Sequence, residues 1–322
     1  MTDIAQQNTL GFDDIQTAAT IVAAHLPPTP MWEYPQLSDV VGARLHIKHE
    51  NTQPTGAFKV RGALNLLGRM NPAGLARGVV TYSTGNHALA IAYAAREFGA
   101  PCTVVMPEAA NPSKVRAVRA LKAEVALHGV NMADMERHAT TLSAGNGFTL
   151  VSPGDTPELI AGVGSAYLEA LHQLPAADAI VVPVGAGTGA AAACLVAAQL
   201  APACRVIGVQ SSSAPAAHDS WRARDLLHRP NETTVEGLAT GRGFAVPQSV
   251  LRDHLADFLL VTDEEIGAAR RLLATHAHTL AEGAGAAALA GILRHPDRFT
   301  GQTIIVMCTG GNAGPTELAT LG

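Results

Sequence analysis

The sequence predicts an α/β protein built on a parallel β-sheet with helices on both of its faces. Short apolar segments alternate with helical patterns along most of the 322 residues, and strands that are apolar throughout are typical of parallel sheets buried on both sides. Several of these strands lead through a glycine-containing turn directly into a helix, as in repeated strand–helix–strand units. Because 48% of the residues are hydrophobic, the chain can bury a large core and is long enough for two lobes.

The first half of the chain begins with a helix. Residues 12–26 have apolar side chains at helical spacing, and the pattern stops at Pro27-Pro28. Residues 43–50 alternate like a strand, and a helical run beginning near Lys59 follows them. The next elements are predicted as strands at 78–82, 102–106, 125–127 and 148–151, and as helices at 88–98, from 112, at 132–142 and up to 174.

The second half continues the same alternation. Apolar strands are predicted here next to helical patterns, at 179–184, 205–209, 258–261 and 303–307. No repeat period stands out, and the composition is biased only toward alanine. The whole chain therefore fits one α/β architecture.

Composition argues against several classes of protein. The formal net charge is −5, charged residues make up 15%, and no Lys/Arg run is present, which argues against nucleic acid or an anionic membrane surface as a partner. The apolar stretches are interrupted well short of a membrane span, and residues 1–16 are polar and acidic, unlike a secretory signal. The four cysteines lie in apolar runs without metal-ligand spacing. These features predict a reduced, cytoplasmic protein.

The segment Gln53-Pro-Thr-Gly-Ala-Phe-Lys-Val-Arg-Gly-Ala63 places a lysine directly after an aromatic residue, at the predicted start of a helix. A lysine held in such a turn can be desolvated, and desolvation lowers its pKa toward that of a nucleophilic free amine. Taken alone, a lysine at this position is more often an ordinary residue that caps a helix. The turns elsewhere in the chain decide between the two interpretations.

Glycine-containing turns follow three of the predicted strands. Residues 83–87 (Ser-Thr-Gly-Asn-His) and 185–189 (Gly-Ala-Gly-Thr-Gly) each open a helix, where free backbone N–H groups and the helix dipole favour an anion. Residues 308–312 (Cys-Thr-Gly-Gly-Asn) follow the last strand. Each could be a plain capped turn, and a single glycine-rich turn also fits dinucleotide-binding folds. Together with Lys59 they supply what a phosphorylated aldehyde cofactor needs.

This set of motifs resembles that of the fold type II (tryptophan-synthase-β-like) pyridoxal-phosphate enzymes, in the branch of threonine/serine dehydratases and serine racemase. The resemblance covers about residues 12–312. It implies a large domain that binds pyridoxal 5′-phosphate, made of residues 1–75 and 150–322, and a smaller inserted αβ domain at 76–149. It also implies association into a homo-oligomer, a dimer in many relatives.

The resemblance further implies roles for individual residues. Lys59 forms the internal Schiff base and acts as a catalytic base, Phe58 packs on the cofactor ring, and the Thr309 hydroxyl meets the pyridine nitrogen. Asn86 bonds the 3′-oxygen of the cofactor, and Gly237 lies beside the cofactor. The phosphate-binding residues are Gly185, Ala186, Gly187, Thr188 and Gly189, and the substrate-binding residues are Ser83, Thr84, Gly85, Asn86 and His87.

The sequence departs from the family pattern at several positions. Ala57 replaces a usual serine, and Ala186 and Thr188 interrupt what is a run of four glycines in the dehydratase branch. Gln210 and Ala216 occupy positions at which some relatives bind a divalent cation with carboxylates. Hard cations prefer carboxylate oxygens, so no metal is predicted there. Glu236 and Glu282 also lie in family-like turns and receive no catalytic role.

The predicted activity is α,β-elimination of water from a small 3-hydroxy amino acid, threonine- or serine-like, to give a 2-oxo acid and ammonia. Lys59 would combine covalent catalysis with general base catalysis. A racemase is the alternative, with Lys59 and the Thr84 hydroxyl as paired catalytic groups, as is a dehydratase of the hydroxyectoine-utilisation type. A catalytically silent ligand-binding relative is the non-enzyme alternative. Met135 stands where some relatives that accept acidic substrates have arginine, which argues against a β-carboxylate.

Overall fold

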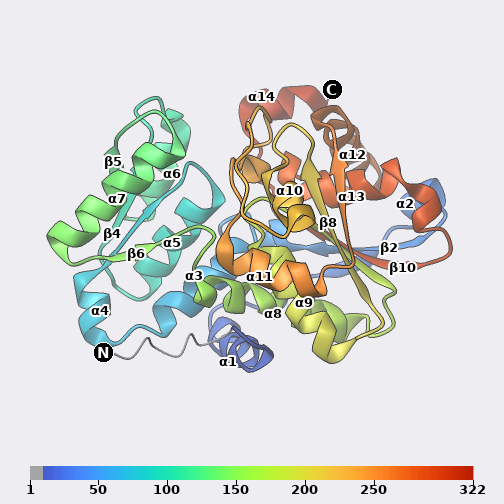
Figure 1. Cartoon of the computed structure of the whole chain (residues 1–322), viewed down its shortest axis with the longest axis horizontal. Helices are drawn as coiled ribbons and strands as arrows, with labels where there is room; N and C mark the ends of the chain where they lie inside the picture. The colour runs from blue at the N-terminus through green and yellow to red at the C-terminus, as the bar shows by residue number, and fades with distance from the viewer. Residues whose placement is uncertain (1–9, 322) are drawn as a thin grey trace.

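The computed structural model describes residues 10–321, and two β-sheets organise it. A six-stranded sheet has the order β1-β2-β10-β7-β8-β9, and a four-stranded sheet has the order β5-β4-β3-β6. The two sheets lie side by side in separate lobes (Figure 1). We call the lobe around the six-stranded sheet the large domain and the lobe around the four-stranded sheet the small domain. The expectation of no secretory signal rests partly on residues 1–9, which lie outside the described residues.

The large domain contains both ends of the described chain. Its strands are β1 (Met31–Glu33), β2 (Arg44–His49), β7 (Ala179–Pro183), β8 (Arg205–Ser211), β9 (Asp257–Val261) and β10 (Thr303–Cys308). Its helices are α1 (Phe12–Ala23), α2 (Pro35–Val41), α3 (Lys59–Gly68), α8 (Pro157–Gln173), α9 (Thr188–Leu200), α10 (Ala216–Ala223), α11 (Ala245–His254), α12 (Asp263–His276), α13 (Gly283–Arg294) and α14 (Pro315–Leu318).

The small domain lies between β2 and β7 in the sequence, after the short helix α4 (Pro72–Arg77). Its strands are β3 (Val79–Tyr82), β4 (Cys102–Met106), β5 (Glu124–Leu127) and β6 (Thr149–Val151), and its helices are α5 (Asn86–Glu97), α6 (Pro112–Ala120) and α7 (Met132–Asn146). All of its strand pairs are parallel. On β3, Val79 packs toward α5 and Val80 toward α7, since successive side chains of a strand point to opposite faces.

The large sheet is parallel except at one edge. β1 pairs antiparallel with β2, placing Met31 opposite Lys48, and it is the one strand of the described chain that the sequence did not predict. Its three residues, Met-Trp-Glu, are too few and too exposed to form an apolar run. The remaining strands are parallel, as predicted.

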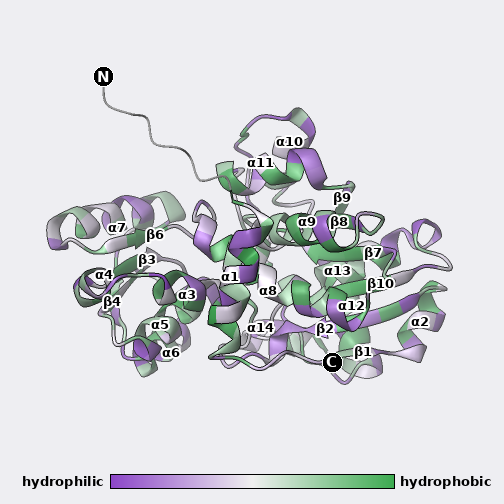
Figure 2. Cartoon of the chain, turned by 90° about the horizontal axis from the view of Figure 1, so that it is seen from below, coloured by the Kyte–Doolittle hydropathy of each residue, from purple (hydrophilic) through white to green (hydrophobic). Residues whose placement is uncertain are grey.

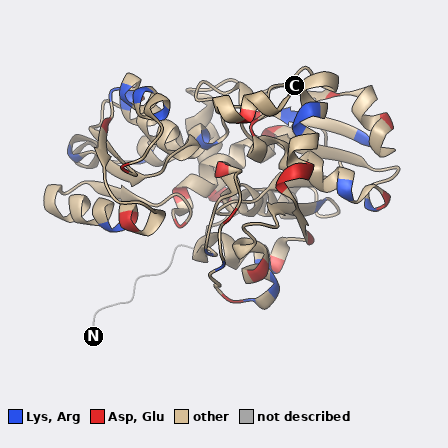
Figure 3. Ribbon diagram, turned by 90° about the horizontal axis from the view of Figure 1, so that it is seen from above, with Lys and Arg blue, Asp and Glu red and all other residues tan. Residues whose placement is uncertain are grey.

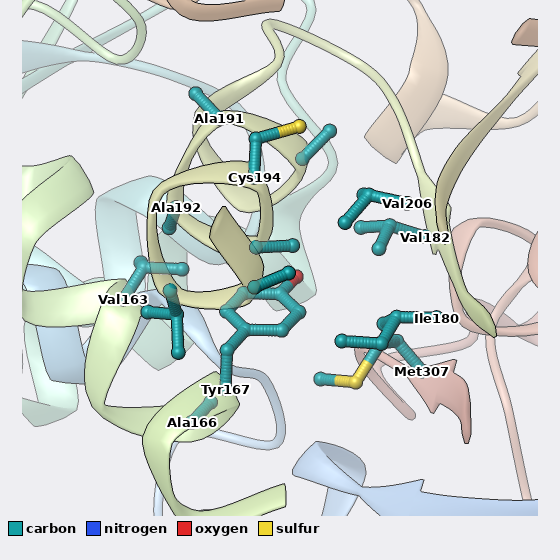
Figure 4. Close-up of a cluster of buried hydrophobic side chains, with 14 of the residues drawn as sticks. Val163, Ala166, Tyr167, Ile180, Val182, Ala191, Ala192, Cys194, Val206 and Met307 are labelled. Atoms are coloured by element: carbon teal, nitrogen blue, oxygen red, sulfur yellow. The ribbon is translucent and has the colours of Figure 1, made fainter. Parts of the chain in front are cut away.

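Helices cover both faces of the large sheet, and alternate residues of each strand pack on opposite layers. On β7, Ile180 and Val182 face a layer that includes α8 and α9, and Ala179 and Val181 face a layer that includes α12 and α13. Figure 4 shows Tyr167 of α8 among residues of α9 and the strands. Hydrophobic residues accordingly gather on the strands and inner helices (Figure 2). This two-sided burial explains the continuous apolar strands of the sequence.

Several predicted boundaries shift. α1 ends at Ala23 rather than at residue 26, and α7 continues to Asn146 rather than to 142. None of the helices in the described part of the chain is both long and apolar enough to cross a membrane. Within residues 10–321, no group of three or more His, Cys, Asp or Glu side chains has a metal-binding arrangement.

Candidate active site

Residues of both domains line a cavity of about 600 Å³. The turns that follow β3, β7 and β10 all open into it, with Thr84, Gly185 and Thr309 as examples. The carboxyl ends of parallel strands are where α/β proteins bind their ligands. Chain segments far apart in the sequence thus converge on one space.

Lys59 enters this cavity from the first position of α3. Its ammonium lies 5.3 Å from the centre of the Phe58 ring. Burial lowers the pKa of Lys59 to about 8, although the carboxylate of Glu282 nearby acts to raise it. About a tenth of Lys59 is therefore the neutral amine at pH 7, which is the form that a nucleophile or proton acceptor must have.

The loop before Lys59 is fixed by the turn after β10. The Phe58 N–H donates to the Thr309 carbonyl (3.0 Å), and the Gly311 N–H donates to the Gly56 carbonyl (2.9 Å). Gly56 has a φ of +71°, and a Cβ there would lie 2.3 Å from the Asn312 side chain. Glycine is required at this position because both the backbone conformation and the available space exclude a side chain.

Residues 185–189 form a loop at the N-terminus of α9. No side chain caps this helix, so its first N–H groups are available to an anion. A Cβ on Gly185 would lie 2.4 Å from the Gly237 carbonyl oxygen, which keeps the backbone of the loop bare. These features, with Lys59 on the same cavity, fit a phosphorylated aldehyde: the loop for its phosphate and the lysine for its carbonyl carbon.

Residues 83–87 form the equivalent turn in the small domain. The Gly85 N–H donates to the Ser83 hydroxyl oxygen (3.2 Å), and Asn86 is the first residue of α5. Asn86 donates to Glu282 (2.5 Å) and accepts from Asn312 (2.8 Å). The amide of Asn86 is therefore oriented by two residues of the large domain.

His87 lies buried behind this turn. Its Nε2 is 2.8 Å from the Thr81 hydroxyl, and that hydroxyl donates to the Val151 carbonyl (2.8 Å), so the Nε2–H of His87 is the donor. Burial and the nearby charge of Lys59 lower the pKa of His87 to about 3. His87 is consequently neutral at physiological pH.

Glu282 lies at the N-cap of α13 and lines the same cavity. Burial raises the pKa of Glu282 to about 7, with the hydrogen bond from Asn86 acting in the opposite direction. The carboxyl group is therefore close to half-protonated at neutral pH. Such a shifted group in a cavity is typical of functional sites.

Thr309, at the end of β10, is almost fully buried, and its hydroxyl lies 3.4 Å from the Ala284 carbonyl. A hydroxyl can donate to or accept from a ring nitrogen and does not require that nitrogen to be protonated. This position is consistent with the contact to the pyridine nitrogen that the sequence predicted.

All of the site residues predicted from the sequence line this one cavity. They are Phe58, Lys59, Ser83, Thr84, Gly85, Asn86, His87, Gly185, Ala186, Gly187, Thr188, Gly189, Gly237 and Thr309. Sequence reasoning gave no role to Lys114, Glu236, Glu282 or Asn312, which also line it. The signal for Glu282 was present, since a Glu-Gly-Ala-Gly turn opens a helix there. Lys114 carried no local signal, because a lysine in an amphipathic helix is commonplace.

Gln210, at the position of a carboxylate in some relatives, is fully buried. Its Oε1 accepts from the His218 N–H (3.0 Å). The amide oxygen thus holds the backbone of the following segment directly. The prediction that no metal binds at this position remains open to experiment.

Comparison with known proteins shows the family to which the chain belongs. The family model described as "Pyridoxal-phosphate dependent enzyme" matches residues 22–310. The chain belongs to this family. Among its relatives is the L-threo-3-hydroxyaspartate ammonia-lyase of Saccharomyces cerevisiae, 31% identical over 311 residues, which cover 96% of this chain and 95% of that protein.

Two further relatives of this pyridoxal-phosphate enzyme differ in their named activities. The L-threonine ammonia-lyase of Geobacter sulfurreducens is 38% identical over 277 residues, which cover 85% of this chain and 69% of that protein. The solved structure of maize serine racemase superposes with a TM-score of 0.92 at 28% identity, covering 97% of this chain and 96% of that one.

These findings confirm the predicted fold class and the predicted cofactor, pyridoxal phosphate. They also support the predicted class of activity, a pyridoxal-phosphate-dependent ammonia-lyase acting on a hydroxy amino acid.

Proposed function

We propose that this enzyme eliminates water from a small 3-hydroxy amino acid with an uncharged side chain, threonine- or serine-like, and that hydrolysis of the product takes up one water and releases a 2-oxo acid and ammonia. The observation that carries the proposal is Lys59, whose pKa is lowered to about 8 in a cavity between an anion-binding loop and Thr309. The proposed domain boundaries, 1–75 with 150–322 and 76–149, leave this cavity between the domains, although β6 of the small domain continues to Val151.

The residues that would hold the cofactor are Lys59 at the aldehyde carbon, residues 185–189 at the phosphate and Thr309 at the ring nitrogen. Phe58, Asn86 and Gly237 would contact the ring and its substituents. When bound, the cofactor supplies an electron sink for charge that develops at the substrate Cα. Because Thr309 offers a hydroxyl rather than a carboxylate, the ring nitrogen need not be protonated, which suits elimination from Cβ.

The chain's own groups account for binding and proton transfer. The turn at 83–87 binds the substrate carboxylate, because the N-terminus of α5 presents N–H groups and a positive dipole end. The neutral amine of Lys59 accepts the proton from Cα. His87 is neutral, so the low pKa of Lys59 comes from burial rather than from repulsion by a charged imidazole.

The charges of the cavity support an uncharged substrate side chain. The lysines among its described lining residues are Lys59 and Lys114, and Lys114 is paired with Glu236. Met135 contributes an apolar wall. A second carboxylate on the substrate would have to displace Glu236. Even so, 3-hydroxyaspartate is the natural competing substrate to test, given the name of the yeast relative.

The experiment is a 2-oxo acid release assay across 3-hydroxy amino acids, comparing threonine, serine, phenylserine and the 3-hydroxyaspartate isomers. We expect the highest kcat/KM for threonine or serine. Lys59→Ala should abolish turnover and the absorbance of lysine-bound cofactor, whereas Lys122→Ala, on the surface of the small domain, should leave both unchanged. Retention of that absorbance in Lys59→Ala would contradict the assignment.

Racemisation is the second candidate, because the Thr84 hydroxyl lines the cavity and could serve as a second proton carrier. Chiral analysis of the unreacted amino acid separates the two activities. A lyase leaves the remaining substrate enantiomerically pure, and a racemase does not. Thr84→Val keeps the shape of the side chain and removes the hydroxyl, so it should suppress only a racemase. Homodimer formation and a cytoplasmic location stay predictions.

A further inference from the structure

A seven-residue segment of the large domain, Glu236–Arg242, connects the cavity to the small domain at two points. We call it the strap. Its first residue, Glu236, forms an ion pair with Lys114 of α6. Its last residue, Arg242, forms an ion pair with Glu136 of α7 (3.2 Å). Both helices belong to the small domain, so one short segment joins it to two neighbouring helices.

The two ion pairs have opposite polarity. The strap contributes the acid at one end and the base at the other, and the small domain contributes the complement at each point. Sliding the strap to exchange its partners would bring like charges together, so only one arrangement of the domains satisfies both pairs. Acidic and basic residues occur in both domains (Figure 3).

The Arg242 end is supported on both sides. The Tyr82 hydroxyl of β3 donates to Glu136 (2.8 Å), and the Arg242 guanidinium lies 4.8 Å from the centre of the Phe244 ring. The strap backbone is held by the segment before it, since the Arg229 N–H donates to the Gly241 carbonyl (2.9 Å). The Glu136 carboxylate and the Arg242 guanidinium, which meet between the two domains, are therefore both preoriented.

The middle of the strap rests on the anion-binding loop. The Thr240 hydroxyl donates to the Gly185 carbonyl (3.2 Å). Gly237 also packs closely on Gly185, because a Cβ added to Gly185 would lie 2.4 Å from the Gly237 carbonyl oxygen. A change in the conformation of residues 185–189 would therefore displace the strap residues that contact them. The strap thus contacts the anion-binding loop, α6 and α7.

We infer that the strap positions the small domain over the cavity, with Arg242 and Glu136 as positioning residues. The strap also couples closure of the small domain to occupancy of the anion-binding loop, residues 185–189. The side chains of both ion pairs are 25–62% exposed. Exposed pairs contribute little free energy each, so they can break and reform as the small domain opens and closes. The inference rests on the proposed cofactor site and does not depend on which amino acid is the substrate.

Arg242 and Glu136 offer the cleanest test, because neither is among the residues that line the cavity. We expect Arg242→Gln and Glu136→Gln each to raise KM about two- to fivefold with kcat within about twofold. The two changes together should have no more effect than one alone, because they remove the same pair. The charge-swapped variant Arg242→Glu/Glu136→Arg should recover most of the lost affinity.

The matched control is Arg137→Gln, which removes an ion pair with Asp134 inside α7 and should leave KM and kcat unchanged. A purely structural role for Arg242 predicts no recovery in the charge-swapped variant. That result, or a rise in KM as large in Arg137→Gln, would overturn the inference. A fall in kcat at constant KM in Arg242→Gln would overturn it as well.

Amide hydrogen exchange gives a readout that does not depend on turnover. Saturating pyridoxal 5′-phosphate should slow exchange in the strap and in α6 and α7 of the wild-type protein. In Arg242→Gln, the cofactor should still slow exchange at residues 185–189 but no longer in α7. Equal slowing of α7 in the two proteins would show that the strap does not transmit occupancy. If no substrate is turned over, this measurement still decides the inference.

Discussion

Two sets of ion pairs near the cavity differ in their surroundings. Behind α3, Arg61 forms two-pronged hydrogen bonds with both Glu50 and Glu169, at 2.7–2.8 Å. Lys48 also donates to Glu169 (2.9 Å). We call these four residues the buried cluster, because the Arg61, Glu50 and Lys48 side chains are 0% exposed and that of Glu169 is 19% exposed. The strap pairs, in contrast, face solvent.

The comparison shows that burial determines whether an ion pair stays formed or can separate and be solvated by water. Burial acts to raise the pKa of Glu50, but Arg61, together with Thr29 and Lys48, keeps the pKa below its ordinary value. Every charge of the buried cluster has a partner, and removing one would leave another charge uncompensated in a low-dielectric interior. The cluster therefore joins β2, α3 and α8 permanently, which fixes the first turn of α3 and so Lys59. The strap pairs can exchange with water.

The largest effect is expected for the buried cluster. Arg61→Met should lower the free energy of unfolding by about 3–5 kcal/mol, since Glu50 and Glu169 would lose their shared partner. Urea denaturation of the cofactor-free protein measures this change. Arg44→Met, which removes an exposed pair with Glu33, is the matched control and should cost less than about 1 kcal/mol. Similar losses in the two variants would contradict the distinction between buried and exposed pairs.

Glu282 is an intermediate case, because it is buried with the neutral Asn86 as its hydrogen-bond donor. Its pKa in the folded protein is about 7, above the ordinary value of 4.5, so the folded state binds its proton more tightly than the unfolded state. Stability should therefore fall as the pH rises from about 4.5 to about 7, by on the order of 3 kcal/mol.

Thermal unfolding of the cofactor-free protein across this pH range tests the point. Glu282→Gln preserves the shape and the acceptor for Asn86, so its stability should lack this decline. The stability difference between variant and wild type should grow with pH and level off above about 7. A constant difference would mean that Glu282 does not titrate in this window.

A smaller effect on stability is expected for the strap. Arg242→Gln should change the free energy of unfolding by less than about 1 kcal/mol, and the difference from wild type should shrink at about 1 M salt. Urea denaturation at low and high salt provides the comparison. A loss as large as that of Arg61→Met would show that the strap pair is structural rather than reversible.

No effect is expected from removing divalent cations. Gln210 uses its side-chain oxygen to accept from the His218 N–H, and an amide is a poorer ligand for hard cations than a carboxylate. Treatment with a chelator should leave both the melting temperature and the activity unchanged, and adding Mg²⁺ or Ca²⁺ should not raise either. A cation-dependent rise in melting temperature would refute the absence of a metal at this position.

Much of the fold followed from the sequence because its signals are local. The apolar strands at 179–184 and 303–307 match β7 and β10 to within one residue, since a strand buried on both faces must be apolar at every position. β1 was missed because an edge strand of three residues needs no apolar run. The end of α1 was placed too late because the apolar spacing continues past Ala23 into a segment that is no longer helical.

The sequence by itself determined which residues carry the chemistry of the cofactor: a lysine at a helix start and the turns at 83–87, 185–189 and 308–312, each recognisable from neighbouring residues. Only the tertiary structure decided the surroundings of these groups. The pKa values of Lys59 and Glu282, the partners of Arg61 and the contacts of the strap depend on residues far apart in the chain, such as Asn86 and Glu282, which are 196 positions apart. Burial and Coulomb interactions act through space, so no local pattern in the chain records them.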